Sequence, residues 1–340
     1  MRISRVAGVL AGAALVTGSL VVPAAAAPAF VPADTGARIT GEQWLDSATV
    51  DLTVSTPSLD GPQLVRVIVP AGWSREASRT WPVVYAYHGG RDTAVSWTRS
   101  TDIEQVAARY DVIVVMPEGG WNGSHANWHN FGLGGRPKWE TFHVQEVVQL
   151  AERNLRAGTQ RAVMGASSGG QGALAYAGRH PGTFRYAASF SSVLHMTTPA
   201  MQSLVLTTAA VWGGVWIPGA IYGWPLLNEF VWRAHDAYHL VPKLKGTGLY
   251  VSAGTTGNPG PFEPTDANLL EQLAGRLIGG FGEATVGAST RSFVDEARRR
   301  GVPVTANLYG NGWHQWAYWD AEYKKAWPLM MDTIGARQVG

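Results

Sequence analysis

The sequence predicts an α/β fold, in which a mainly parallel central sheet carries helices on both faces. Three observations support this prediction. Short apolar runs alternate with amphipathic stretches, one predicted strand runs through a glycine-rich turn directly into a predicted helix, and no repeat or low-complexity linker interrupts the pattern. Short apolar runs of this kind are typical of strands buried on both faces of a parallel sheet.

The expected elements follow one another from residue 37. Residues 37–60 alternate loosely between polar and apolar and end in turn residues, as a leading strand and turn do. The other expected strands are Gln63 to Val69, Trp81 to Tyr87, Val112 to Met116, Arg161 to Met164, Tyr186 to Phe190, Gly248 to Ser252 and Val302 to Tyr309. The expected helices are Thr101 to Tyr110, Phe142 to Leu155 and Ser168 to His180. This order predicts one catalytic domain with an insertion, rather than two domains.

Residues 1–26 have the order of a secretory signal peptide. Two arginines precede an apolar run from Val6 to Val22, and a stretch of small residues follows. This order predicts cleavage after Ala26, export, and a single mature domain over residues 27–340. An uncleaved membrane anchor is the alternative, because the apolar run approaches spanning length.

Composition excludes several classes of function. Only 15% of the 340 residues are charged and the formal net charge is +2, so no strong field favours nucleic acid. The chain has no cysteine, which excludes disulfides, thiol catalysis and thiolate metal sites. Neither a metal-ligand cluster nor a nucleotide-binding loop is evident in the sequence, so we expect no cofactor and no metal. Oligomeric state stays open.

An apolar insertion covers about residues 193–228. This stretch has no Lys, Arg, Asp or Glu and includes Trp212, Trp216 and Trp224. A transmembrane segment is disfavoured because Pro218 and repeated glycines interrupt the run. Two interpretations remain, a buried structural excursion and an apolar cap or groove that receives a fatty chain. We favour the second.

The segment Gly165-Ala166-Ser167-Ser168-Gly169 matches the pattern Gly-x-Ser-x-Gly. The match alone is weak in a glycine-rich chain, but here a predicted strand precedes it and a predicted helix follows it. This context is that of a nucleophile elbow, in which small neighbours allow a strained turn to expose the serine hydroxyl. The helix N-terminus also favours developing negative charge. We therefore predict Ser167 as the nucleophile; the alternative is a glycine-rich turn without chemistry.

Acyl transfer also needs two N–H donors for the tetrahedral oxyanion. In proteins with this elbow, one donor is the residue after the nucleophile, here Ser168, and the other belongs to a glycine-rich loop after an earlier strand. His88-Gly89-Gly90 forms such a loop, so Gly90 is the second candidate donor. The alternative is that these three residues form only a turn.

The general base is expected to be His314. Proteins with this elbow place nucleophile, acid and histidine in that order along the chain. Five of the nine histidines follow Ser167, and only His314 lies in the last hundred residues, in a glycine and aromatic loop just beyond a predicted strand. A loop position at the end of a strand suits a base that must face the elbow. The alternative is a surface histidine in an aromatic loop.

The triad acid is less sharply defined by the residues themselves. Six carboxylates lie between the strand near Tyr250 and the base: Glu263, Asp266, Glu271, Glu283, Asp295 and Glu296. Position alone favours the first two, because they follow the strand most closely. Composition does not choose among the six.

Four motifs together carry a family resemblance. They are Met116-Pro117-x-Gly119-Gly120, Lys138-Trp139-Glu140-Thr141-Phe142, the elbow, and Gly312-x-His314-x-Trp316-x-Tyr318-Trp319. Over about residues 63–335 the chain resembles the antigen 85 mycolyltransferases of actinobacteria, within the esterase D group of α/β-hydrolases. The resemblance implies an α/β-hydrolase sandwich, in agreement with the alternation of strands and helices.

The resemblance also implies roles for individual residues. In the family the acid is a Glu ten residues before a helical Phe and about thirty before the histidine, and Glu283 has this spacing, with Asp295, Glu263 and Asp266 behind it. The other matches are Ser167 for the nucleophile, His314 for the base, Gly90 and Ser168 for the oxyanion donors, and Arg91 and Trp316 for sugar contacts. Three departures are His88 in place of Asp, Gly90 in place of Leu and Gln315 in place of Ser. They leave the triad intact and change the trehalose subsite.

The sequence thus predicts an exported serine acyltransferase that works through a Ser-His-Glu triad and an acyl-enzyme. The resemblance implies transfer of a long, mycolyl-type acyl group from an ester donor to a sugar hydroxyl such as that of trehalose. A secreted carboxylesterase that transfers the group to water is one alternative. A catalytically silent protein that binds cell wall or matrix is the other. Cell-envelope lipids are further candidate partners, and nucleic acid is not expected.

Overall fold

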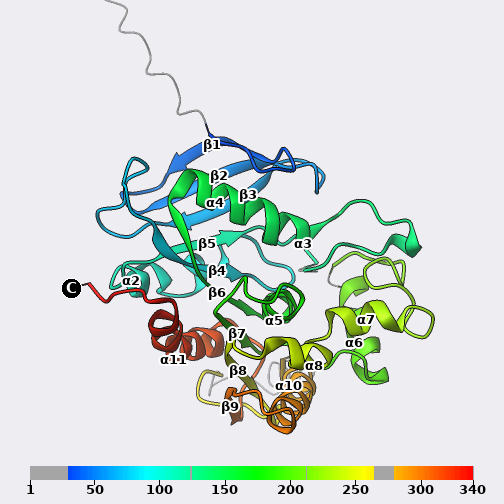
Figure 1. Ribbon diagram of the computed structural model, residues 1–340. Coiled ribbons are helices and arrows are strands. Elements are labelled where there is room, and N and C mark those ends of the chain that lie inside the picture. The colour runs from blue at the N-terminus through cyan, green and yellow to red at the C-terminus, as the bar shows by residue number, and fades with distance from the viewer. Residues whose placement is uncertain (1–29, 123–124, 212, 264–278, 340) are drawn as a thin grey trace, which may run out of the picture.

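The computed structural model describes residues 30–122, 125–211, 213–263 and 279–339, which fold around one nine-stranded sheet (Figure 1). The predicted signal peptide, residues 1–26, lies outside the described residues. The strands are β1 (Arg38–Trp44), β2 (Thr49–Ser55), β3 (Gln63–Ile68), β4 (Trp81–Tyr87), β5 (Ile113–Pro117), β6 (Ala157–Ala166), β7 (Tyr186–Phe190), β8 (Gly248–Gly254) and β9 (Thr305–Gly310). Their order across the sheet is β1-β2-β3-β5-β4-β6-β7-β8-β9.

The sheet has an antiparallel edge and a parallel body. β1 pairs with β2, β2 with β3 and β3 with β5 in antiparallel register, and the pairs from β5 through β9 are all parallel. The predicted mainly parallel sheet is therefore confirmed. Because parallel strands end at the same edge of a sheet, the loops after β4, β6, β7, β8 and β9 gather there.

Helices cover both faces of the sheet (Figure 1). They are α1 (Ser96–Ser100), α2 (Ile103–Ala107), α3 (Trp139–Thr141), α4 (Val148–Leu155), α5 (Ser168–Arg179), α6 (Pro199–Val211), α7 (Glu229–His235), α8 (Ala237–Leu240), α10 (Phe281–Arg299) and α11 (Trp316–Ile334), with short segments η1 (Asn130–Gly132), η2 (Phe142–Val147) and η3 (Val241–Leu244). Along β4, Val83 and Tyr85 pack in one core with α4, α5 and α10, while Val84 and Ala86 pack in another with α2 and α11. This alternation is the two-residue period of a strand buried on both faces.

Several element boundaries differ from those predicted. The segment 37–60 forms two strands, β1 and β2, instead of one. The helix expected over 101–110 is shorter, α2 over Ile103–Ala107, and the separate helix α1 before it was not predicted. Thr101 between them is extended, and its hydroxyl donates to the carbonyl of Trp97 at 2.6 Å. β9 begins at Thr305 rather than Val302; Pro303 has no N–H to donate to a neighbouring strand.

The excursion expected for about residues 193–228 leaves the sheet after β7 and returns before β8. It carries α6 and α7 and has a small core of its own, in which Met196, Tyr222 and Trp232 are buried. Its two ends meet, since the N–H of Tyr238 donates to the carbonyl of Leu194 at 2.9 Å. None of the helices in the described parts of the chain combines the length and the apolar character needed to cross a membrane.

Candidate active site

Ser167 lies in a strained turn between β6 and α5. Its backbone has φ 55° and ψ −127°, a conformation that non-glycine residues rarely adopt. Glycines make the turn possible, because a Cβ on Gly165 would overlap the backbone of Gly169 and a Cβ on Gly169 would overlap the carbonyl of Tyr87. The serine is therefore lifted from the end of the strand toward solvent, as in a nucleophile elbow.

Ser167, His314 and Glu283 form a continuous chain of hydrogen bonds. His314 Nε2 lies 2.9 Å from Ser167 Oγ, and His314 Nδ1 lies 2.7 Å from Glu283 Oε2. Because a carboxylate only accepts, the proton belongs on Nδ1, and Nε2 is then free to accept the serine proton. The structure thus brings together three residues from the elbow, the helix α10 and the loop after β9.

Glu283 is fully buried and its second oxygen is saturated with donors. Glu283 Oε1 accepts hydrogen bonds from Gly254 N at 2.6 Å, Ser191 Oγ at 2.8 Å and Tyr309 Oη at 3.0 Å. Burial raises the pKa of Glu283, but the hydrogen bond and charge of His314 and these donors outweigh it, so the pKa lies below its usual value. The carboxylate is therefore ionised and orients His314.

These supporting donors were missed by reasoning from sequence. Ser191 follows β7, Gly254 ends β8 and Tyr309 lies at the end of β9. Burial, followed by the negative charge of Glu283, raises the pKa of Tyr309 far above its usual value, so its hydroxyl remains a donor. The signal that could have found them is positional, because all three stand where adjacent parallel strands end.

The loop after β4 passes directly over the nucleophile. A Cβ on Gly89 would lie 3.0 Å from Ser167 Cβ, so a side chain there would press on the nucleophile. Gly90 and Ser168 both line the cleft above the serine, and a Cβ on Gly90 would lie 4.0 Å from Ser168 Oγ. Ser168 is the first residue of α5, where backbone N–H groups have no partner within the helix. Both candidate oxyanion donors thus flank the nucleophile.

His88 lies buried beneath this loop and is held by backbone groups and by Glu118. Its Nδ1 lies 2.7 Å from the carbonyl oxygen of Gly89, and its Nε2 accepts from the N–H of Gly119 at 2.7 Å and lies 3.1 Å from Glu118 Oε1. Because Nε2 accepts, Nδ1 carries the proton and donates to Gly89. The residue that replaces the family's Asp therefore contacts the loop that carries Gly90 and is not among the residues that line the cleft.

A cleft of about 390 Å³ opens above Ser167. One wall comes from the excursion between β7 and β8, and its apolar lining residues are Val193, Leu204, Val205, Ala209 and Ile221. Val286 of α10 also lines the cleft. Trp316 lines the cleft, and its indole N–H donates to Asp92 at 3.1 Å. Arg91 is exposed and lies outside the lining, with its own N–H bound to the carbonyl of Trp121. Of the two predicted sugar contacts, Trp316 therefore lines the cleft and Arg91 does not.

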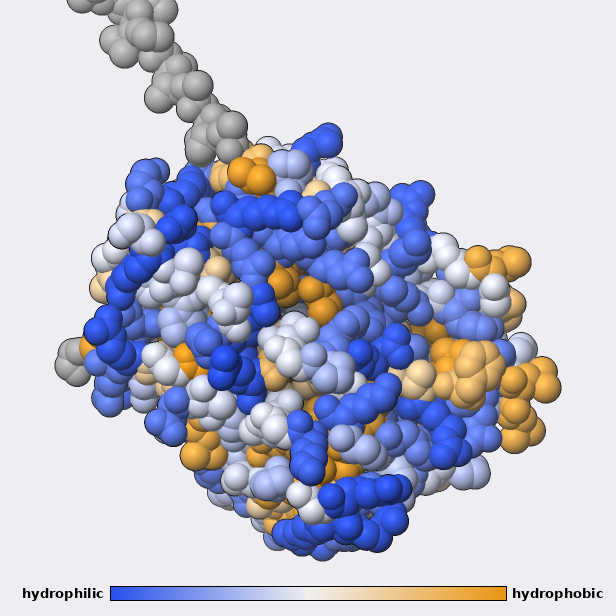
Figure 2. Space-filling model, in the orientation of Figure 1, coloured by the Kyte–Doolittle hydropathy of each residue, from blue (hydrophilic) through white to orange (hydrophobic). Residues whose placement is uncertain are grey.

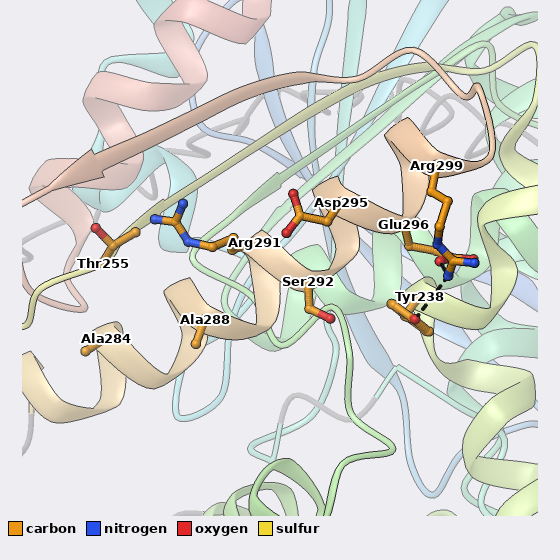
Figure 3. Close-up of a pocket in the computed structure, with 9 residues that line it drawn as sticks. All are labelled: Tyr238, Thr255, Ala284, Ala288, Arg291, Ser292, Asp295, Glu296 and Arg299. Atoms are coloured by element: carbon orange, nitrogen blue, oxygen red, sulfur yellow. Dashed lines mark hydrogen bonds and ion pairs between the residues drawn. The ribbon is translucent and has the colours of Figure 1, made fainter.

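A second cavity, of about 480 Å³, lies along the outer side of α10 (Figure 3). Ser292 lines it and contacts a histidine, since Ser292 Oγ lies 2.7 Å from His195 Nδ1. This second Ser–His pair lacks an oxyanion site, because Ser292 is inside a helix whose N–H groups bond to carbonyls of the preceding turn. The pair at Ser167 is therefore the one suited to acyl transfer.

Among the described residues, His195, Asp236 and His239 could hold a metal ion, with candidate ligand atoms within 4.8 Å of one another. The hydroxyl of Thr197 already bridges two of them by hydrogen bonds. The hydroxyl of Thr197 lies 2.9 Å from Asp236 Oδ2 and 2.9 Å from His239 Nε2. We assign this trio a structural role at the base of the excursion.

Comparison with known proteins agrees with this geometry. The family model "Putative esterase" matches residues 56–328. The chain belongs to this esterase family. The chain is 30% identical over 256 residues to the esterase Rv1288 of Mycobacterium tuberculosis. The match covers 70% of this chain and 50% of that protein, so the chain spans about half the length of that relative. It is 29% identical to the diacylglycerol acyltransferase/mycolyltransferase Ag85B of Mycobacterium intracellulare, over 76% of this chain and 77% of that protein.

The solved structure of MPT51 (FbpC1) from Mycobacterium tuberculosis has the same fold as this chain. The TM-score is 0.65 at 22% sequence identity, over 85% of this chain and 99% of that one. The predicted α/β-hydrolase fold and the predicted relationship to the antigen 85 group are confirmed. The family comparison likewise supports the predicted class, a serine esterase or acyltransferase.

Proposed function

We propose that this esterase is an exported serine acyltransferase that uses a Ser167-His314-Glu283 triad and a covalent acyl-enzyme. The observation that carries the proposal is the unbroken chain of hydrogen bonds, 2.9 Å from His314 to Ser167 and 2.7 Å from His314 to buried Glu283. A base within hydrogen-bond reach of the nucleophile and oriented by a third group is the arrangement that nucleophilic catalysis requires. Export rests on the pattern of residues 1–26.

The reaction has two halves. His314 removes the proton of Ser167 Oγ as the oxygen attacks the ester carbonyl, and the N–H groups of Gly90 and Ser168 stabilise the oxyanion. His314 then gives the proton to the departing alcohol, which leaves the acyl group on Ser167. An acceptor hydroxyl enters, loses its proton to His314 and takes the acyl group, while Ser167 recovers a proton.

The cleft favours a fatty acyl group, since its wall from the excursion is apolar. For the acceptor we propose a sugar hydroxyl, such as that of trehalose, because this is what the resemblance of the sequence motifs to those of the antigen 85 mycolyltransferases implies. Hydrolysis is the second candidate, favoured by two observations: Arg91 is exposed outside the cleft lining, and buried His88 is bound to Gly89, Gly119 and Glu118. Water would then be the acceptor.

The nucleophile is tested with Ser167→Ala. We expect this variant to lose both ester turnover and covalent labelling by a fluorophosphonate probe. Ser292→Ala is the matched control, because it removes the serine of the second Ser–His pair, and we expect it to keep both. Turnover or labelling that persists in Ser167→Ala would overturn the mechanism, and a parent protein that is never labelled would favour a silent binding protein.

The acceptor is tested by incubating the parent protein with a long-chain acyl ester, with and without trehalose, and identifying the products by mass spectrometry. Acylated trehalose supports the transferase. Free fatty acid alone, with and without the sugar, supports the hydrolase.

A further inference from the structure

Apolar side chains protrude from the edge of the molecule that the excursion forms. We define the apolar patch as Phe131, Leu133, Val211, Trp216, Ile217, Trp224, Leu226, Leu227 and Phe230, all of them exposed. Leu226 is 94% exposed and Leu227 is 78% exposed. Figure 2 shows hydrophobic residues gathered at the edge where Figure 1 places α6 and α7. Contiguous apolar surface of this kind marks an interaction site in a soluble protein.

Hydrogen-bonded turns present these side chains. The N–H of Trp224 donates to Asn228 Oδ1 at 2.9 Å and the N–H of Asn228 donates to the carbonyl of Trp224 at 2.8 Å, so Leu226 and Leu227 occupy the tip of a closed turn. The loop that bears Phe131 and Leu133 is tied to the same region, because the N–H groups of residues 129 and 130 donate to the carbonyls of residues 221 and 220, each at 2.9 Å. The apolar patch is therefore held in place by hydrogen bonds within its turn and between its two loops.

The apolar patch is continuous with the wall of the active-site cleft. Leu204, Val205 and Ala209 of α6 line the cleft, and the same helix ends at exposed Val211, which belongs to the patch. An apolar chain leaving the cleft on this side would meet apolar surface. This continuity connects the patch to the chemistry at Ser167.

We propose that the apolar patch docks the esterase onto a lipid surface, from which an acyl chain enters the cleft. The entry of an acyl chain into the cleft rests on the proposed function, whereas docking on a lipid surface does not. A lipid surface fits because the segment 193–228, which supplies six of the nine patch residues, has no charged residue that could specify a protein partner. Protruding leucines also need no matching pocket in a fluid lipid layer, and tryptophans favour the boundary between lipid and water. A protein partner would need a complementary packed surface.

Docking is tested by flotation with phosphatidylcholine vesicles in a Ser167→Ala background, so that no turnover takes part. We expect the parent to float with the vesicles and Leu226→Ser/Leu227→Ser to lower the partition coefficient at least tenfold. The matched control is Leu45→Ser/Leu329→Ser, which removes two exposed leucines on other elements and should leave binding unchanged. Circular dichroism and thermal unfolding show that each variant is folded.

Four outcomes would overturn the proposal. The first three are a parent that does not float, a patch variant that floats like the parent, and equal losses in patch and control variants. The fourth is a parent dimer that becomes a monomer in the patch variant without vesicle binding, which would assign the patch to a second copy.

Kinetics with Ser167 intact separates this proposal from the proposed function. We expect Leu226→Ser/Leu227→Ser to keep the turnover of a short, soluble ester within about twofold of the parent. Turnover of a long-chain ester carried in vesicles should fall about tenfold. Absence of turnover and labelling in the parent would refute the proposed function, while flotation would still decide the docking.

Discussion

At the scale of single residues, the identity of the triad acid can be tested by removing its charge. Glu283→Gln keeps the size of the side chain but cannot orient His314 in the required tautomer or stabilise its charged form. We expect kcat to fall about 10³- to 10⁴-fold, measured by ester turnover. Asp295→Asn is the control, because Asp295 lies on the same helix but lines the second cavity (Figure 3). Equal losses in the two variants would contradict the assignment.

Glu263 has a different task, although it was an alternative candidate for the acid. It is buried and accepts hydrogen bonds from Trp313 N at 3.0 Å, Gln315 Nε2 at 3.0 Å and Tyr318 Oη at 2.5 Å, so it fixes the loop on both sides of His314. A Gln side chain cannot accept all of these bonds. We expect Glu263→Gln to lower kcat and the rate of fluorophosphonate labelling together, by about 10- to 100-fold, because the base is misplaced. An unchanged labelling rate would contradict this positioning role.

The sequence supports different site residues to different degrees. Ser167 follows from a local motif in its context, and His314 follows from chain order, so both could be predicted from the residues themselves. Glu283 needed a family spacing, because its approach to His314 depends on how α10 packs beside β8. The buried role of Glu263 was not predictable, since it arises from contacts with residues 50 to 55 positions away.

At the scale of elements, the junction of β6 and α5 depends on the absence of a side chain at Gly165. Gly165→Ala would place a Cβ against the backbone of Gly169, so the strand or the helix must shift. We expect the free energy of unfolding to fall by about 3 kcal/mol, measured by urea denaturation. Gly282→Ala is the control, because a Cβ there meets no atom within 4 Å and alanine favours the helix. Comparable stability of the two variants would contradict the steric argument.

Element boundaries show what the sequence predicts less well. The strands of the parallel body could be predicted because short continuous apolar runs are typical of strands that are buried on both faces of a parallel sheet. The break between α1 and α2 involves one hydroxyl, that of Thr101, and the spacing of apolar residues along the sequence gives no sign of it. The excursion was recognised by its missing charges, but its helices were not predicted, because apolar residues on every side of α6 leave no amphipathic period.

At the scale of the whole molecule, one buried carboxylate joins the body to the excursion. Glu140 accepts from Arg179 Nε and His180 Nε2, each at 2.7 Å, and Arg179 also donates to the carbonyl of Ala234 in α7 at 2.9 Å. Burial raises the pKa of Glu140, but His180, His235 and Arg179 lower it far below its usual value. The ionised form therefore stabilises the fold.

The sign of the pH dependence follows from this lowered pKa. The stabilisation is present above the ordinary pKa of a glutamate, about 4.3, and is lost as pH falls toward the lower value in the folded state. We expect Glu140→Gln to lower the free energy of unfolding by about 3 kcal/mol at pH 7. The difference from the parent should shrink as pH falls from about 5 to 3, measured by urea denaturation at each pH.

Asp60→Asn is the matched control for this experiment, because Asp60 forms an exposed ion pair with Arg136. Such pairs contribute little to stability. A constant difference between Glu140→Gln and the parent across the same pH range would show that the charge of Glu140 is not the source of the effect.

The hydrogen bond between residues 194 and 238 at the base of the excursion has a consequence for how proteins with this fold diversify. Because the two ends are already neighbours, a segment of another length can start and finish at the same points without altering the order of the strands. Doubling the length of a flexible loop costs only about 0.6 kcal/mol of closure entropy. The segment can therefore be exchanged for another, in evolution or by grafting, which changes one wall of the cleft while Ser167, His314 and Glu283 stay in place.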